Sequence, residues 1–195
     1  MADAPTELIL ASSSPTRREI LEALGLRFRI EPPDYEETRP PGLSPGDLAE
    51  ALALGKARGV ARRFPEALVL GADQILVCDG ELFSKPEDAA AARAQLQRLR
   101  GRQHHLITGV ALLCEKSHAL RVQHELTRIS MRMVGDDEID RYVETGEWEG
   151  SVGAYRIEGR GLKLFDRVEG DIFNARGLPA LRVLNALREL GFPLF

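Results

Sequence analysis

Two arginines follow a serine-rich segment at the start of the first expected helix. The apolar run Leu8–Ala11 predicts a buried strand, and Ser12 comes directly after it. Ser14 is a favourable N-cap, so Arg17 and Arg18 fall in the first helical turn. A cation there costs an isolated helix about 0.3–1 kcal/mol, because that end of the helix dipole is positive. A bound phosphate would reverse the sign, since backbone N–H groups, hydroxyls and guanidiniums would face it. The alternative is that both arginines are solvated on an exposed face.

A single carboxylate interrupts the strongest apolar strand of the chain. Asp73 lies inside the run from Ala67 to Val77, where burying an unpaired carboxylate would be costly. It therefore needs a partner, which can be a cation, a metal ion or the backbone of a bulge. Gly71 leaves space beside the strand, which favours a ligand there.

Two lysines and two acids extend this set of candidate groups. Lys85 stands just before a helix expected to start at Pro86, from which a lysine can reach a phosphate. Lys56 lies on the polar side of the second expected helix, and either lysine alone can be a solvated surface charge. Glu36 and Glu37 lie in a proline-bracketed loop, where paired acids suit Mg²⁺ that bridges to phosphates. The alternative is a solvated acidic loop.

Taken together, these residue types suit hydrolysis of a phosphoanhydride. Cations would hold a triphosphate, acids would hold Mg²⁺, and one carboxylate would orient the attacking water. The elements that must position them alternate early between strand and helix, and paired strands follow in the middle of the chain. This order predicts a mixed α/β sheet. The expected strands are 8–11, 28–30, 67–77, 105–114 and 119–131, the expected helices are 15–24, 44–63, 86–100, 136–145 and 179–190, and residues 150–177 are expected to hold short strands and turns.

Size and composition restrict the class of protein. The 195 residues, 44% apolar and 29% charged, suit one soluble domain or two small lobes. A net charge of −4 disfavours nucleic-acid binding, and no segment reads as a membrane span or a signal peptide. Cys78 and Cys114 stand far apart in apolar surroundings, which predicts buried thiols in a reducing cytoplasm. The four histidines lack the spacing of metal ligands.

A series of motifs resembles the Maf family of nucleoside triphosphate pyrophosphatases. The resemblance extends over nearly the whole chain, so residues 1–195 are expected to form a single Maf-like domain. The motifs are Leu10–Arg18, Gly71–Gln74, Ser84–Pro86, Thr108–Leu112, Gly153–Gly159, Glu169–Asp171 and Gly177–Pro179.

The resemblance implies an α/β fold like that of inosine triphosphate pyrophosphatase, with an elongated mixed sheet, flanking helices and two lobes around a central cleft. It implies hydrolysis of a nucleoside triphosphate to the monophosphate and pyrophosphate with a divalent metal, Mg²⁺ or Mn²⁺. By position, Asp73 matches the catalytic aspartate and also a metal ligand. The matching phosphate and metal residues are Ser12, Arg17, Glu36, Lys56 and Lys85, and Ser14 and Arg18 join the substrate-binding set. A homodimer is expected as well.

Three positions bear on which nucleotide base the resemblance implies for the substrate. Where the dTTP/UTP type has arginine, threonine and glutamine, this chain has Thr16, Gln74 and Glu158. The last two resemble the 7-methyl-GTP branch, whereas Thr16 replaces that branch's tryptophan. A carboxylate at Glu158 can accept both N1–H and the N2 amino group of guanine, which predicts a guanine-type substrate. The alternatives are that Glu158 pairs with Arg156 or Arg160, that the enzyme is of the dTTP/UTP type, or that the chain is a non-catalytic regulator of cell division.

Overall fold

The computed structural model describes residues 7–195, which belong to two compact units. Unit 1 comprises the chain up to Asp73 together with Thr108–Glu125 and Gly177–Phe195. Unit 2 comprises Gln74–Ile107 and Leu126–Arg176. Each is described by itself below. Within residues 7–195, no helix combines the length and the apolar composition that crossing a membrane requires.

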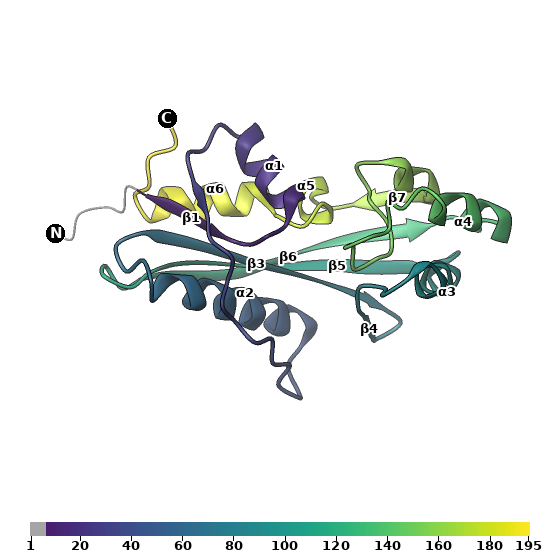
Figure 1. The fold of residues 1–195 in the computed structure, drawn as a ribbon, viewed down its shortest axis with the longest axis horizontal. Helices are drawn as coiled ribbons and strands as arrows, with labels where there is room; N and C mark the ends of the chain where they lie inside the picture. Colours follow the sequence, from purple (N-terminus) through teal and green to yellow (C-terminus); the bar gives the residue numbers. More distant parts are fainter. Residues whose placement is uncertain (1–6) are drawn as a thin grey trace. The chain divides into compact units, whose positions relative to one another are not determined.

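The strands form a seven-stranded mixed sheet, which confirms the expected α/β class (Figure 1). Its order is β2-β1-β3-β5-β6-β7, and β4 pairs with β3 outside this path. β1 is parallel to β2 and β3, whereas the β3–β4 and β6–β7 pairs are antiparallel. The strands are β1 (Leu8–Ala11), β2 (Arg29–Ile30), β3 (Leu68–Cys78), β4 (Glu81–Phe83), β5 (Gln103–Cys114), β6 (Ala119–Met131) and β7 (Phe165–Glu169).

Two serines begin the first two helices of unit 1, as the sequence predicted. Ser14 caps α1 (Pro15–Ala23), and Ser44 caps α2 (Pro45–Ala61), where its Oγ accepts from the Asp47 backbone N–H at 3.2 Å. The third helix is α6 (Ala180–Glu189). In Figure 1, α2 lies on one side of the strands of this unit, and α1 and α6 lie on the other.

Small side chains dominate the core between α2 and the strands of unit 1. Gly71 of β3 and Gly109 of β5 both face the backbone of α2 so closely that a Cβ at either position would overlap a carbonyl oxygen, that of Ala53 or that of Ala49. The helix can therefore approach the sheet more closely than larger residues would allow. The buried members of this cluster are Ile9, Ala11, Ala53, Ala57, Val60, Ala61, Ala67, Val69, Ala111 and Leu113.

Unit 2 contains more short helices than the sequence predicted. Helices α3 (Ala89–Leu99) and α4 (Asp136–Val143) were expected, whereas the 3₁₀ helix η1 (Arg160–Leu164) and α5 (Ile172–Ala175) were not. Strand β7 is the one expected feature of residues 150–177 that the structure shows as a strand. Helices η1 and α5 could not be predicted from the sequence, because five and four residues are too few to show a helical period.

Helix α3 begins later than the sequence predicts. Asp88 caps α3 by accepting from the Ala91 backbone N–H at 2.7 Å, so the helix starts at Ala89 and the expected start at Pro86 is wrong. A side-chain cap outweighs the preference of proline for a first turn. The expected turn at 79–80 is confirmed, because Asp79 and Gly80 both have positive φ and join β3 to β4 as a hairpin.

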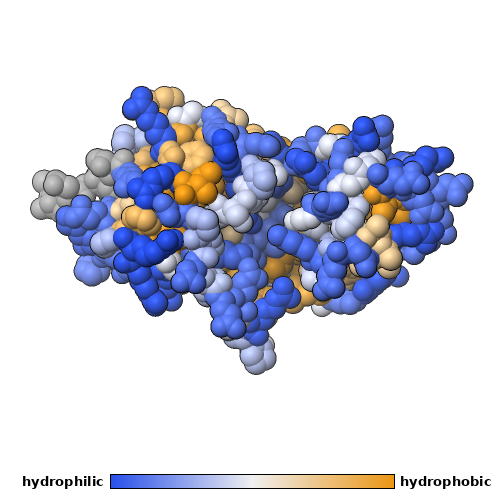
Figure 2. All heavy atoms as spheres, in the orientation of Figure 1, coloured by the Kyte–Doolittle hydropathy of each residue, from blue (hydrophilic) through white to orange (hydrophobic). Residues whose placement is uncertain are grey.

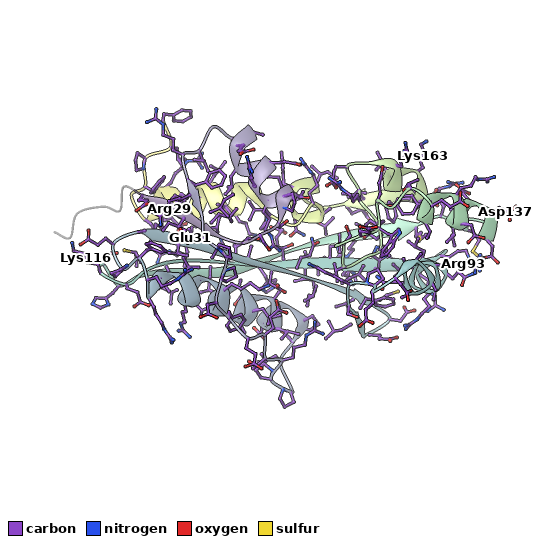
Figure 3. The ribbon with its side chains drawn as sticks, viewed as in Figure 1. Arg29, Glu31, Arg93, Lys116, Asp137 and Lys163 are labelled. Carbon is purple, nitrogen blue, oxygen red and sulfur yellow. The ribbon has the colours of Figure 1, made fainter. Side chains whose placement is uncertain are left out.

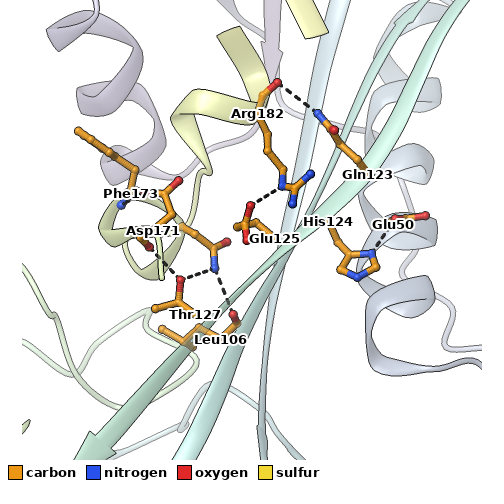
Figure 4. Close-up of polar contacts among 10 residues, drawn as sticks. Glu50, Leu106, Gln123, His124, Glu125, Thr127, Asp171, Phe173 and Arg182 are labelled. Atoms are coloured by element: carbon orange, nitrogen blue, oxygen red, sulfur yellow. Dashed lines mark hydrogen bonds and ion pairs between the residues drawn. The ribbon is translucent and has the colours of Figure 1, made fainter. Parts of the chain in front are cut away.

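The core of unit 2 contains large aromatic residues and neutral polar groups. Phe83, Trp148, Tyr142 and Tyr155 are among its buried members. Close to β6, the Thr127 hydroxyl donates to the Asp171 carbonyl at 2.8 Å (Figure 4). Neutral hydrogen-bonded groups of this kind can be buried at small net cost.

Charged residues cover much of the surface. The face drawn in Figure 2 is mostly hydrophilic, with separate small hydrophobic areas. In unit 1, Arg29 pairs with Glu31 at 2.9 Å, and in unit 2 Arg93 extends from α3 (Figure 3). Cys78 and Cys114 are both free and buried, which confirms the expectation for the thiols.

Candidate functional site

The partner of Asp73 is a cation. This carboxylate lies on β3 with 9% of its surface exposed, and it is the one charged residue among the buried polar residues of the described chain. The Lys56 ammonium of α2 donates to Asp73 Oδ1. The same nitrogen lies 2.7 Å from Glu37 Oε1. Of the three partners that the sequence left open, the structure therefore shows the cation.

The close packing of α2 brings Lys56 to Asp73. Residues two apart in a strand share a face, so Gly71 and Asp73 both face α2. Because Gly71 has no side chain, α2 approaches β3 until the Gly71 Cα lies against the Ala53 carbonyl and the Ala57 amide. The Lys56 side chain is only 15% exposed. The alternative of a solvated surface lysine is therefore excluded for Lys56.

Arg17 is held at the N-terminus of α1 by contacts far away in the sequence. Its Nε donates to the Gly177 carbonyl at 2.9 Å, and its Nη1 donates to Ser12 Oγ at 3.2 Å. Burial of the guanidinium lowers its pKa, and the charges of Asp73 and Glu37 oppose that shift. The native environment therefore disfavours this charge, and an anion bound beside it would relieve the cost.

The two hydroxyls of the first segment orient this N-terminus. Ser12 is 5% exposed, and its Oγ accepts from the Ser14 backbone N–H at 3.1 Å as well as from Arg17. Ser14 Oγ in turn accepts from the Arg17 backbone N–H at 3.5 Å. Thr16 lies half-buried in the same helical turn. Unit 1 thus gathers a cation, two hydroxyls and a helix N-terminus, which is a suitable environment for a phosphate.

Two of the predicted site residues belong to unit 1, but their side chains do not join Arg17, Lys56 and Asp73. Arg18 forms an exposed ion pair with Glu22 at 2.7 Å, one turn along α1. Glu36 is exposed, and its neighbour Glu37 is the acid that reaches Lys56. The sequence predicts Glu36 as the metal ligand of these two adjacent acids, whereas the acid that contacts Lys56 is Glu37. Successive side chains of an irregular loop point in different directions, so spacing alone gave no signal for Glu37.

The remaining assigned residues lie in unit 2. Lys85 is exposed and precedes α3 by a short loop, so it is not at the helix start. Gln74 donates from Nε2 to the Asn174 carbonyl at 2.7 Å. Glu158 lies 3.3 Å from the Arg156 guanidinium, with a side chain about 21% exposed. This is the pairing that the sequence held open as the alternative to base recognition.

The carboxylate oxygens of unit 1 are the kind of ligand that a divalent metal ion binds. Two carboxylates, from Asp73 and Glu37, converge on the single cation of Lys56, so their oxygens already surround a position of positive charge. Mg²⁺ is commonly held by one or two carboxylates together with water and substrate phosphates. Among residues 7–195 no three His, Cys, Asp or Glu side chains form a metal cluster. Asp73 and Glu37 are therefore the residues that would hold the ion.

Comparison with known proteins assigns the family. The model of the family described as Maf-like protein matches residues 7–190. The chain belongs to the Maf-like family. The expected family is thereby confirmed, while its 7-methyl-GTP branch stays a prediction.

Similar Maf-like proteins carry the names of pyrophosphatases. The chain is 44% identical to a dTTP/UTP pyrophosphatase of Symbiobacterium thermophilum, over 97% of this chain and 96% of the relative. It is 43% identical to a nucleoside triphosphate pyrophosphatase of Granulibacter bethesdensis (94% and 96%) and 41% identical to a 7-methyl-GTP pyrophosphatase of Chromohalobacter salexigens (95% and 97%). The expectation of a pyrophosphatase, a hydrolase, is confirmed at this level.

Proposed function

We propose that this chain hydrolyses a nucleoside triphosphate between its α- and β-phosphates and releases the monophosphate and pyrophosphate. The observation that carries this proposal is the buried carboxylate of Asp73, held by Lys56. Burying a charged pair costs several kcal/mol before its attraction is counted (~20 kcal/mol per ion in the idealised limit), so such a pair is weak evidence for stability. A catalytic carboxylate, in contrast, must be fixed in place.

The step is an in-line displacement at the α-phosphorus. Water supplies the attacking oxygen, one O–H bond breaks as the P–O bond forms, and pyrophosphate leaves with the electrons of the old P–O bond. Lys56 occupies Asp73 Oδ1, and Oδ2 receives the proton of the water. Arg17, oriented by Ser12 and Gly177, binds the phosphate charge.

A divalent cation, Mg²⁺ or Mn²⁺, would neutralise phosphate charge when bound by Asp73 and Glu37. Lys56 Nζ contacts both carboxylates, so the two acids already lie close to each other without the ion. The chain itself therefore prearranges the acids.

The base is proposed to be guanine-type, with 7-methyl-GTP first. Support comes from the residue types at Gln74 and Glu158, since a carboxylate accepts the two adjacent donors of guanine. The second candidate is a dTTP/UTP type, favoured by relatives of that name, such as those of Symbiobacterium thermophilum and Pelotomaculum thermopropionicum. The ion pair of Glu158 with Arg156 also favours this second candidate, because it engages the carboxylate.

One nucleotide panel tests reaction and base together. Purified wild type, Asp73→Asn and Glu158→Gln are incubated with 7-methyl-GTP, GTP, UTP and dTTP, with pyrophosphate and orthophosphate assayed separately. Asp73→Asn is expected to lose about 10²–10⁴ in rate, the usual effect of a positioned base. Glu158→Gln is expected to change the ranking of nucleotides while the reaction persists.

Three results would contradict the proposal. Orthophosphate as the first product would indicate attack at the γ-phosphate. Hydrolysis of no nucleotide would favour a non-catalytic regulator. UTP or dTTP as the best wild-type substrate would select the second candidate. A homodimer in the cytoplasm also remains a proposal, and sedimentation of the purified chain tests the dimer.

A further inference from the structure

The acidic loop of unit 1 lies against two glycines of α2. A Cβ at Gly55 would lie 2.6 Å from Tyr35 Oη and closer still to the ring carbons. A Cβ at Gly59 would lie 2.6 Å from the Asp34 carbonyl oxygen. Gly55 and Gly59 are four residues apart, so they share one face of the helix. The loop thus occupies a shallow face that only glycine leaves open.

This contact lies directly beside the charged groups of the site. Gly55 precedes Lys56 in α2, and Tyr35 precedes Glu37 by two residues in the loop. Glu37 Oε1 lies 2.7 Å from Lys56 Nζ. The Tyr35 ring lies on Gly55, and in this position of the loop the Glu37 carboxylate lies at the Lys56 ammonium, which also binds Asp73.

The ion pair of Glu37 cannot hold the loop by itself. Its side chain is 45% exposed, and ion pairs at such positions contribute little because water screens them. Tyr35 is half-buried, and its ring makes a larger apolar contact with the helix. Glycine is also unfavourable inside a helix, so two of them in α2 need a reason other than helix stability.

We propose that Tyr35 is a positioning residue, whose ring rests on Gly55 of α2 and keeps the Glu37 carboxylate at Lys56. Its role in turnover rests on the proposed function, because it acts through Glu37. The ring is the required part, and the Tyr35 hydroxyl is dispensable.

Coupling between two substitutions tests this role. Tyr35→Ala and Gly55→Ala are each expected to lower kcat/KM about tenfold, whereas Tyr35→Phe stays within about twofold of wild type. In a Glu37→Gln background, Tyr35→Ala is expected to change kcat/KM by less than about twofold, because the group it positions is already gone. Independent, multiplicative losses would overturn the proposal, as would equal damage from Tyr35→Phe and Tyr35→Ala.

Gly46→Ala is the matched control. It makes the same substitution in the same helix, and its Cβ would meet the exposed ring of His124, 2.6 Å from Cε1. Activity close to wild type is expected for this variant, because the exposed ring can turn away at the cost of its contact with Glu50, which lies outside the site. A loss equal to that of Gly55→Ala would mean that α2 merely tolerates no alanine, which would overturn the specific role of Tyr35.

A measurement without nucleotide separates this proposal from the proposed function. Amide exchange of residues 34–38 is expected to accelerate in Tyr35→Ala and to keep its wild-type rate in Glu37→Gln, since the ring and not the ion pair holds the loop. Unchanged exchange in Tyr35→Ala would overturn the proposal even if the enzyme is active. A wild type that hydrolyses no nucleotide would instead contradict the proposed function and leave the exchange result to decide on Tyr35.

Discussion

Both units bury neutral polar groups, but only unit 1 also buries a carboxylate among the described residues. Besides the neutral Ser12 and Thr108, unit 1 buries the carboxylate of Asp73, with the partly buried cations Lys56 and Arg17 close to it. Unit 2 buries the neutral groups of His104, Thr127 and Asn174 among large aromatic rings. Its ion pairs, such as Arg93 with Asp140, lie at the surface.

Buried neutral groups and buried charges contribute differently to the free energy of unfolding. Neutral hydrogen-bonded groups in a core contribute modestly to stability, whereas buried charges often give no net gain. The proposed function accounts for the charges of unit 1 by a bound ligand, whereas packing accounts for the neutral polar groups of unit 2. Small residues allow the charged arrangement, because they let α2 bring Lys56 to β3.

The largest expected effect on stability comes from charging the core of unit 2. His104 Nε2 lies 2.7 Å from Tyr155 Oη, and burial lowers the pKa of His104 to about 4. Between pH 6.5 and 4 the His104 side chain binds a proton in the unfolded chain but not in the native chain. The stability that the neutral imidazole contributes is therefore complete above pH 6.5 and is lost as the pH falls towards 4. It amounts to about 3 kcal/mol.

Urea unfolding at pH 7.5 and pH 4.5 measures this effect. His104→Gln is expected to remove this part of the pH dependence. His118→Asn, at an exposed turn with positive φ that asparagine tolerates, is the control and is expected to keep the wild-type dependence. An unchanged pH dependence in His104→Gln would show that unit 2 does not keep His104 neutral.

An intermediate effect is expected from filling the close contact in unit 1. Gly71→Ala would overlap the backbone of α2, which cannot move aside as a side chain can, and a loss of about 1–3 kcal/mol in unfolding free energy follows. Gly159→Ala in unit 2 meets only the Glu147 side chain and is expected to change stability by less than about 0.5 kcal/mol. Chemical unfolding of both variants checks this, and equal losses would refute the contrast.

The smallest expected effect on stability concerns the cation of unit 1. Because burial lowers the pKa of Arg17, its charge is unfavourable in the native state, and Arg17→Met is expected to leave the unfolding free energy within about 0.5 kcal/mol of wild type. Nucleotide binding, measured by calorimetry, is expected to fall. A clear loss of stability with unchanged binding would make Arg17 a structural residue and remove the contrast between the units.

Local sequence rules predicted most of the elements of the sheet and helices. Ser14 and Ser44 mark helix starts because their hydroxyls cap backbone N–H groups nearby in sequence. The strand carrying Asp73 was recognisable because its apolar run is long. Residues 160–164 and 172–175 were not, since helices so short have no visible period.

The sequence by itself indicated which groups are candidates for chemistry, because residue types and motifs are local: Asp73, Lys56 and Arg17 were all candidates from their neighbours in the chain. Only the tertiary structure decided their partners. Lys56 meets Asp73 across 17 positions, and Arg17 meets Gly177 across 160. That Glu37 and not Glu36 reaches Lys56 depends on how the loop docks on α2, and the greater exposure of Arg18 than of Arg17 depends on which face of α1 is covered. Burial and charge pairing are properties of packed surfaces, so they exist only once distant segments meet.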